Sequence, residues 1–212
     1  MPMVYQQNIN SCTRLGVWHI TEAESFFIEQ VPVQRNITHP HKRLQHLAGR
    51  FLLKELYPNF PYELIRIADT RKPFLENEAY HFSISHCGEY AAVMVSSENR
   101  VGVDVELISS KVGKVKHKFL SATEQQMIGL LIHGSPSDRG IRLLTLAWSI
   151  KESLFKWYGD GEMDFIKHIQ LDNIRIEDNT GIAHCKILKS QEISLTVHFL
   201  FFNNNCISWV VS

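Results

Sequence analysis

The sequence VGVDVELI, residues 101–108, predicts a β-strand that carries two acids on one face. Successive side chains of a strand point to opposite faces, so the valines share one face while Gly102, Asp104 and Glu106 share the other. The two carboxylates would then lie roughly 6.8 Å apart, twice the rise per residue of a strand. At an effective dielectric constant of about 20 they would repel each other by about 2.4 kcal/mol. The sequence therefore requires something that offsets this repulsion.

Two arrangements would relieve the repulsion between the two acids. A divalent cation bound by oxygens is one, because Mg²⁺ commonly takes one or two carboxylates together with substrate phosphates. Gly102, on the same face, leaves room for a bulky group to approach. The other arrangement is an edge strand whose acidic face lies in water, which screens the two charges. The motif by itself leaves both open.

The segment WSIKESLFKWYG, residues 148–159, predicts an amphipathic helix. At 100° per residue, its apolar side chains fall on one face and Glu152 and Lys156 fall on the opposite face. These two residues are neighbours at a spacing of four. They form either an exposed salt bridge or part of a site, in which Glu152 would complete the acidic cluster and Lys156 would face a phosphate.

The segment FSISHCGEY, residues 82–90, places Ser85 and His86 at the end of a strand, where it enters a tight turn. Loops at strand ends often carry functional side chains, and His86 could donate to a phosphate oxygen or make a local hydrogen bond. A Cys–His nucleophilic pair of His86 and Cys87 is rejected, because adjacent side chains of an extended backbone point apart.

Basic residues gather in two further segments. One is the predicted helix over residues 39–58, where they form a stripe opposite Leu52 and Leu56; the stripe consists of Arg43, His46, Arg50 and Lys54. The other is DTRKPF, residues 69–74, where Arg71 and Lys72 precede a proline and are expected in extended backbone. Both segments suit an exposed phosphate, and both also suit a solvated surface.

The composition of the 212 residues is that of a globular protein, with 44% hydrophobic residues, 21% charged residues and a formal net charge of zero. A neutral chain has no global field that would steer a nucleic acid, so no nucleic-acid partner is expected. The four cysteines show no CxxC spacing, which favours free thiols in a reducing cytoplasm. The N-terminal residues predict no signal peptide, and no apolar run approaches the ~20 residues of a membrane span.

The expected fold class is α+β, because helices and strands do not alternate as a repeated β-α-β-α pattern. Helices are predicted over residues 39–58, 122–132 and 142–159. Strands are predicted over residues 14–20, 79–85, 90–97, 101–108, 169–177, 182–188, 192–202 and 206–212. Each half would hold one main helix with several strands, which suggests two α+β subdomains over residues 1–99 and 100–212.

Taken together, these segments resemble the 4'-phosphopantetheinyl transferase superfamily of the Sfp type. The resemblance covers most of residues 40–165, and its motifs in order are FSISHCGEYAAVMV, VGVDVELI, FLSATE and WSIKESLFKWYGDG. The segment RKPF fits the family's GKP element, with Arg71 where glycine is usual. The resemblance implies two similar α+β halves related by a pseudo-twofold axis, with the active site in the cleft between them.

The resemblance also implies a reaction and a role for each matching residue. The phosphopantetheine arm of coenzyme A would move to a serine hydroxyl of an apo acyl or peptidyl carrier protein, releasing adenosine 3',5'-bisphosphate. The implied ligands of Mg²⁺, with Mn²⁺ as the alternative, are Asp104, Glu106 and Glu152. Glu152 would also be the general base, and Lys156 would contact the pyrophosphate. The implied coenzyme A contacts are Ser85 and His86 at the phosphates, Lys72 at the adenine or 3'-phosphate end, and Arg43 and Arg50 as further candidates for the 3'-phosphate.

Carrier proteins of this class are generally acidic, so their docking surface is expected near residues 112–135, where KVGKVKHKFLS supplies lysines and a histidine. A solvated basic loop is the competing interpretation. One chain with two joined halves would suffice as a monomer, in the cytoplasm, for fatty acid, polyketide or nonribosomal peptide synthesis. Two rival functions are a carrier-binding module that has lost transfer and an unrelated Mg²⁺-dependent phosphohydrolase.

Overall fold

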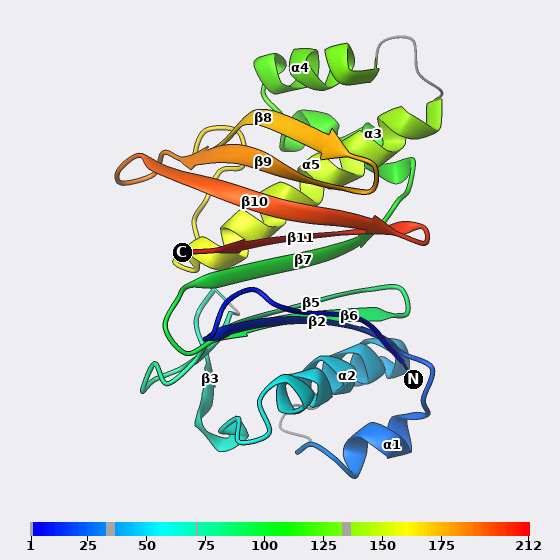
Figure 1. Ribbon diagram of the computed structural model, residues 1–212, viewed down its shortest axis with the longest axis vertical. Coiled ribbons are helices and arrows are strands. Elements are labelled where there is room, and N and C mark those ends of the chain that lie inside the picture. Colours follow the sequence, from blue (N-terminus) through cyan, green and yellow to red (C-terminus); the bar gives the residue numbers. More distant parts are fainter. Residues whose placement is uncertain (1, 33–36, 71, 133–136) are drawn as a thin grey trace.

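The computed structural model describes residues 2–32, 37–70, 72–132 and 137–212 (Figure 1). Arg71, the departure from the GKP element, lies outside these described residues, as do residues 133–135 of the expected docking segment. None of the helices in the described part of the chain combines the length and hydropathy that crossing a bilayer requires. The four cysteines are free, as predicted.

The first half of the chain folds into a four-stranded antiparallel sheet in the order β1-β2-β6-β5. Its strands are β1 (Met3–Asn8), β2 (Thr13–His19), β5 (His81–Cys87) and β6 (Tyr90–Ser96). Strands β5 and β6 form the predicted hairpin, whose two-residue turn is possible because Gly88 adopts φ +56°. The smaller elements of this half are α1 (Glu24–Ile28), η1 (Tyr62–Leu64) and the two-stranded hairpin of β3 (Ile65–Ile67) and β4 (Pro73–Leu75).

Helix α2 (Pro40–Leu56) covers one face of this sheet (Figure 1). Pro40 stands at the helix start, where its missing N–H costs nothing, and the helix ends at Leu56 before Pro58. The apolar stripe of the helix packs with one face of β2, β5 and β6 into a buried core that includes Leu52 and Val93. The predicted helix over 39–58 is therefore confirmed.

The second half folds into a five-stranded antiparallel sheet in the order β7-β11-β10-β9-β8. Its strands are β7 (Val101–Leu107), β8 (Ile169–Glu177), β9 (Thr180–Ile187), β10 (Ile193–Phe202) and β11 (Asn205–Val211). Its helical elements are α3 (Lys111–Val115), η2 (Lys116–Lys118), α4 (Ala122–Ile132) and α5 (Ser137–Tyr158). Helix α5 packs on β7 and β11, and its apolar stripe fills the larger core. The mixed arrangement of helices and antiparallel sheets agrees with the α+β prediction.

The two sheets meet at β7, an edge strand of the second sheet (Figure 1). Its valines, such as Val103 and Val105, are buried between the sheets against residues of β2, β6 and β11. On its free edge the backbone N–H groups bond to side chains of β5 rather than to a neighbouring backbone. The Val103 N–H donates to Ser83 Oγ at 3.0 Å, the Val105 N–H to Ser85 Oγ at 3.2 Å, and the Leu107 N–H to the sulfur of Cys87 at 3.3 Å.

The acidic face of β7 lies against α5 rather than in water. A side chain at Gly102 would meet the carbonyl oxygen of Ser153, and also the backbone nitrogen of Trp157 at 2.8 Å. The interpretation that Gly102 leaves room for a bulky ligand was therefore wrong, because the helix backbone occupies that space. An edge strand with a solvated acidic face is likewise excluded, because Asp104 is only 3% exposed.

The predicted strands and helices are all present, with ends that shift by a few residues, except that α5 begins five residues before the predicted start at residue 142. The sequence pattern did not predict the outermost strand β1, the short helices α1 and α3, or the β3–β4 hairpin. These elements are short or lie at an edge, so their hydrophobic periodicity extends over too few residues to be recognised.

We predict that Gly102→Ala destabilises the protein by about 1–3 kcal/mol, because the added methyl group forces β7 and α5 apart in a close-packed core. Urea denaturation of both proteins measures the change. Gly129→Ala is the matched control, because a side chain at this position of α4 meets nothing within 4 Å. The control should gain up to about 1 kcal/mol from helix propensity. A Gly102→Ala protein as stable as the wild type would contradict the close approach.

Candidate functional site

Asp104 is the most deeply buried of the predicted acids. One of its oxygens, Oδ1, accepts hydrogen bonds from Ser85 Oγ at 2.8 Å and from Lys156 Nζ at 2.7 Å. The other oxygen, Oδ2, is buried and has no hydrogen-bond partner among the described residues. A buried carboxylate oxygen without a partner is costly, so its presence marks a position where a ligand could bind.

Glu106 lies two residues further along β7 and is held by two donors. The indole nitrogen of Trp148 on α5 donates to Oε1 at 2.9 Å, and the thiol of Cys87 donates to Oε2 at 3.5 Å. Burial, and secondly the charge of Asp104, raises the pKa of Glu106. The two donors fix the direction of this carboxylate on the side of β7 that faces α5.

Glu152 brings a third carboxylate to the same space from α5. Burial, followed by the charge of Asp104, raises its pKa to about 7; Glu106 acts in the same direction and Lys156 opposes them. The three predicted acids therefore influence one another through space, although Glu152 is 46 residues from Glu106 in the sequence. The fold brings them together because α5 packs against the acidic face of β7.

The donor chemistry of this cluster fits a hard divalent cation. Carboxylate oxygens are the ligands that Mg²⁺ prefers, and the unpartnered Asp104 Oδ2 offers one directly. In their present arrangement, however, no three His, Cys, Asp or Glu side chains of the described residues form a group that could hold a metal ion. The ammonium of Lys156 instead lies on Asp104, where it offsets part of the negative charge.

Lys156 is brought into the site, as the sequence predicted, and Ser85 lies with it. The Lys156 ammonium donates to both Ser85 Oγ at 2.9 Å and Asp104. Ser85 is buried, and its hydroxyl oxygen also accepts the Val105 N–H of β7. It therefore links the two sheets beside the acids. His86 lies on β5 with an exposed side chain. Partial desolvation lowers its pKa; the charge of Lys156 acts in the same direction and the charge of Asp104 opposes it.

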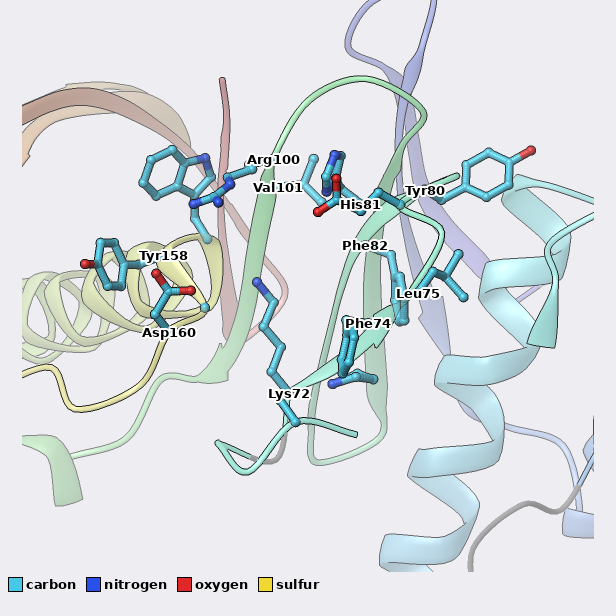
Figure 2. Close-up of a pocket in the computed structure, with 15 residues that line it drawn as sticks. Lys72, Phe74, Leu75, Tyr80, His81, Phe82, Arg100, Val101, Tyr158 and Asp160 are labelled. Carbon is cyan, nitrogen blue, oxygen red and sulfur yellow. The ribbon is translucent and has the colours of Figure 1, made fainter. Parts of the chain in front are cut away.

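Lys72 lies close to the C-terminal end of α5, and it lines two neighbouring cavities. One cavity of about 200 Å³ is lined by Lys72, Lys156 and Gly159, and the other, of about 270 Å³, extends beyond Lys72 (Figure 2). Gly159 adopts φ +82°, and a side chain there would meet Lys72 Nζ at 2.6 Å. The Lys72 ammonium can therefore occupy this position only because Gly159 has no side chain.

The two arginines proposed from the sequence for the 3'-phosphate occupy other environments. Arg43 forms a bidentate ion pair with Glu24 of α1, with N–O distances of 2.8 and 2.9 Å. Arg50 is 5% exposed, and burial lowers its pKa to about 10. The interpretation of the α2 stripe as a solvated face was wrong for Arg50, which lies in the interior.

Lys151, the neighbour of Glu152, received no role from the sequence, and the structure gives it one. Its fully buried ammonium contacts Glu124 at 2.7 Å and donates to the carbonyl oxygens of Phe165 and Ile169 at 2.8 Å. Glu124 also accepts from the Ser121 N–H, which completes a capping box at the start of α4. The S-x-x-E pattern in FLSATE was the available signal, but the partner of Glu124 was not visible in it.

Residues 100–207 match the family described as the 4'-phosphopantetheinyl transferase superfamily, and the chain belongs to this superfamily. Its curated relatives include enterobactin synthase component D of Escherichia coli O157:H7, which is 36% identical over 121 residues, covering 54% of this chain and 54% of the relative. The L-aminoadipate-semialdehyde dehydrogenase-phosphopantetheinyl transferase of Mus musculus is 26% identical over 169 residues, covering 69% of this chain and 53% of the relative. The chain spans about half the length of the curated relatives it matches.

The family match contains the acid cluster and Lys156, but it begins after Lys72, Ser85 and His86. The assignment of the family therefore rests on the second half of the chain. The family match by itself assigns no role to Lys72, Ser85 and His86. Any role for these residues has to be argued from their position beside the second half.

We predict that Lys151→Met destabilises the protein by about 3–5 kcal/mol, because it leaves the charge of Glu124 buried without its partner. Chemical denaturation measures the loss. In the double variant Lys151→Met/Glu124→Gln the loss should be smaller, because the buried charge is removed as well. Equal losses in the single and double variants would show that the ion pair is not the reason for the effect.

Proposed function

We propose that the protein transfers the 4'-phosphopantetheine moiety of coenzyme A to a serine of an apo acyl or peptidyl carrier protein. The products are the holo carrier and adenosine 3',5'-bisphosphate. The observation that carries the proposal is the cluster of Asp104, Glu106 and Glu152 beside Lys156, within a chain of the phosphopantetheinyl transferase superfamily. Phosphoryl transfer depends mainly on such positioning and charge stabilisation.

The three carboxylates are proposed as the ligands of Mg²⁺, with Mn²⁺ as the alternative. When bound, the cation would supply neutralisation of the pyrophosphate charge and polarisation of the attacked phosphorus. The hydrogen bonds from Trp148 and Cys87 support this assignment, because they orient Glu106 as outer partners commonly orient metal-ligating carboxylates.

The remaining steps belong to residues of the chain. Lys156 would contact the pyrophosphate and stabilise negative charge that grows on the leaving phosphate. Glu152, on the same face of α5 one turn earlier, would accept the proton of the attacking serine hydroxyl, directly or through a water. Ser85 would hold Lys156 and Asp104 in position, and Ser85 and His86 together are proposed at the coenzyme A phosphates.

The site is proposed to lie in a cleft between two subdomains, residues 1–99 and 100–212, related by a pseudo-twofold axis. Each half supplies an antiparallel sheet covered by one long helix, which supports the relationship. A single chain would be active as a monomer, because both halves are covalently joined. The free cysteines support a cytoplasmic location.

The carrier protein is proposed to dock on α3 and η2, which follow Glu106 directly along the chain. This segment exposes Lys111, Lys114, Lys116, His117 and Lys118. An acidic carrier would be attracted to this surface, and its position would bring the carrier's serine to the acids. The pathway that the carrier serves, whether fatty acid, polyketide or nonribosomal peptide synthesis, is decided by the carrier.

The proposed function is tested by incubating the protein with coenzyme A, Mg²⁺ and a panel of apo carrier proteins, and then weighing each carrier. A mass gain of one phosphopantetheine on at least one carrier is the expected result. Release of inorganic phosphate from coenzyme A, with no gain of carrier mass, would point to a phosphohydrolase. Carrier binding without transfer would point to a non-catalytic binding module.

We predict that Glu152→Gln lowers kcat for transfer by about 10²–10⁴-fold, because the amide cannot accept the serine proton. The thermal transition of the variant should stay within a few degrees of the wild type, since the substitution preserves the shape of the side chain. A transfer rate close to that of the wild type would contradict the proposed role of Glu152.

We predict that Lys114→Glu/Lys118→Glu raises the KM for the carrier by about tenfold and leaves the KM for coenzyme A unchanged, because charge reversal repels an acidic partner. Steady-state kinetics with each substrate varied in turn measures both constants. Arg175→Glu, an exposed position on β8, is the control for a general effect of added negative charge. Equal changes in the two variants would place the docking surface elsewhere.

A further inference from the structure

A tight loop of residues 159–162, here called the α5 loop, follows α5 and packs against the first half of the chain. Gly159, Gly161 and Glu162 have left-handed backbone, with φ +82°, +66° and +47°. A side chain at Gly161 would collide with the methyl group of Thr70, and Thr70 Oγ1 donates to the carbonyl oxygen of Gly159 at 3.4 Å. The backbone of the α5 loop therefore touches the segment that leads to Lys72.

Lys189 holds the α5 loop from the second sheet. It follows β9, and its ammonium donates to the carbonyl oxygen of Gly161 at 2.8 Å. The same ammonium lies 5.5 Å from the centroid of the ring of Tyr158, the last residue of α5. The backbone beside Lys189 is fixed, because the Leu188 N–H donates to the carbonyl oxygen of His168 at 2.9 Å. A charge-assisted hydrogen bond thus anchors the α5 loop to this sheet.

The α5 loop connects Lys189 with the wall of the two cavities. Lys72 and Gly159 line both cavities, and Lys156 lines the smaller one. Lys72 extends into the space beside the end of α5, where a side chain at Gly159 would meet its ammonium (Figure 2). A displacement of the α5 loop would therefore change the place of the Lys72 ammonium. Lys189 lines neither cavity, so any effect that it has there passes through the loop.

The contacts of Lys189 differ from those of an ordinary surface lysine on the same hairpin. Lys186, on β9, forms an ion pair with Glu192 at 2.7 Å, and both side chains are partly exposed. Such exposed pairs contribute little to stability. The ammonium of Lys189 instead bonds to a backbone carbonyl, so it constrains the path of the main chain where the two halves meet.

We propose that Lys189 is a positioning residue for coenzyme A, which acts through the α5 loop on the wall of the two cavities. The inference rests on the proposed transferase function and on the role beside coenzyme A that the family resemblance gives to Lys72. The acids do not depend on Lys189, because the contact of Lys151 with Glu124 ties α5 to α4. Loss of the Lys189 ammonium therefore weakens the binding of coenzyme A and leaves the chemical step unchanged.

Hydrogen exchange measures the anchoring without substrate, using Lys189→Met, Lys189→Arg and the control Lys186→Met. The reporters are two hydrogen-bonded amides, that of Gly159 in the loop and that of Ala68, which donates to the carbonyl oxygen of Lys72 at 2.9 Å. Lys189→Met should speed exchange at both by about tenfold, the effect of losing one hydrogen bond from a charged group. Lys189→Arg should keep most of the protection, and Lys186→Met should match the wild type. Faster exchange at Gly159 alone, or at neither amide, would overturn the inference.

Calorimetric titration with coenzyme A and transfer kinetics give the second measurement. Lys189→Met should weaken coenzyme A binding and raise its KM by about threefold to tenfold, while kcat and the KM for the carrier stay within about twofold. Lys189→Arg should recover most of the affinity. Unchanged binding, or a loss in kcat alone, would contradict the positioning role. If the wild type binds coenzyme A but transfers nothing, and Lys189→Met weakens that binding, the proposed function fails while the role of Lys189 stands. A wild type that does not bind coenzyme A would overturn both.

Discussion

The free edge of β7 is closed by side chains of β5, and the rest of the structure depends on this contact. Edge strands expose unpaired backbone groups, and each buried N–H without a partner would cost about 1–3 kcal/mol. Ser83, Ser85 and Cys87 accept these N–H groups at every second residue, so the contact fixes the register between the two sheets. With that register fixed, Ser85 lies against Asp104 and Cys87 against Glu106.

The opposite constraint comes from α5, whose backbone approaches β7 at Gly102. Strand β7 is thus held by β11, by β5 and by α5. Its acids lie between β5 and α5, and both of these elements pack directly against the strand. The helix carries Glu152 and Lys156 on the side that meets the strand, while the buried contact of Lys151 with Glu124 ties the same helix to α4. The cluster of acids is consequently assembled from a strand and a helix rather than from loops, which favours precise positioning.

Much of this site could be predicted from the sequence, because its residues sit in regular elements with clear periodicity. The alternation of β7 placed Asp104 and Glu106 on one face, and helical spacing placed Glu152 beside Lys156. The predictions were wrong where the tertiary environment decides the role of a residue. Gly102 was read as space for a ligand, and Arg50 as part of a solvated stripe, because neither the packing of α5 nor the interior position of Arg50 is written in local spacing.

The sequence by itself determined the longer helices and strands, the face on which each acid lies and the family to which the chain belongs, since these depend on local periodicity and on ordered motifs. Tertiary structure alone decided which distant groups share a space. It left Asp104 Oδ2 without a partner among the described residues and gave Lys151 its buried partner. The physical reason is that burial and through-space charge depend on how β7, α5 and the β3–β4 segment pack together, and residues far apart in the chain contribute equally to that packing.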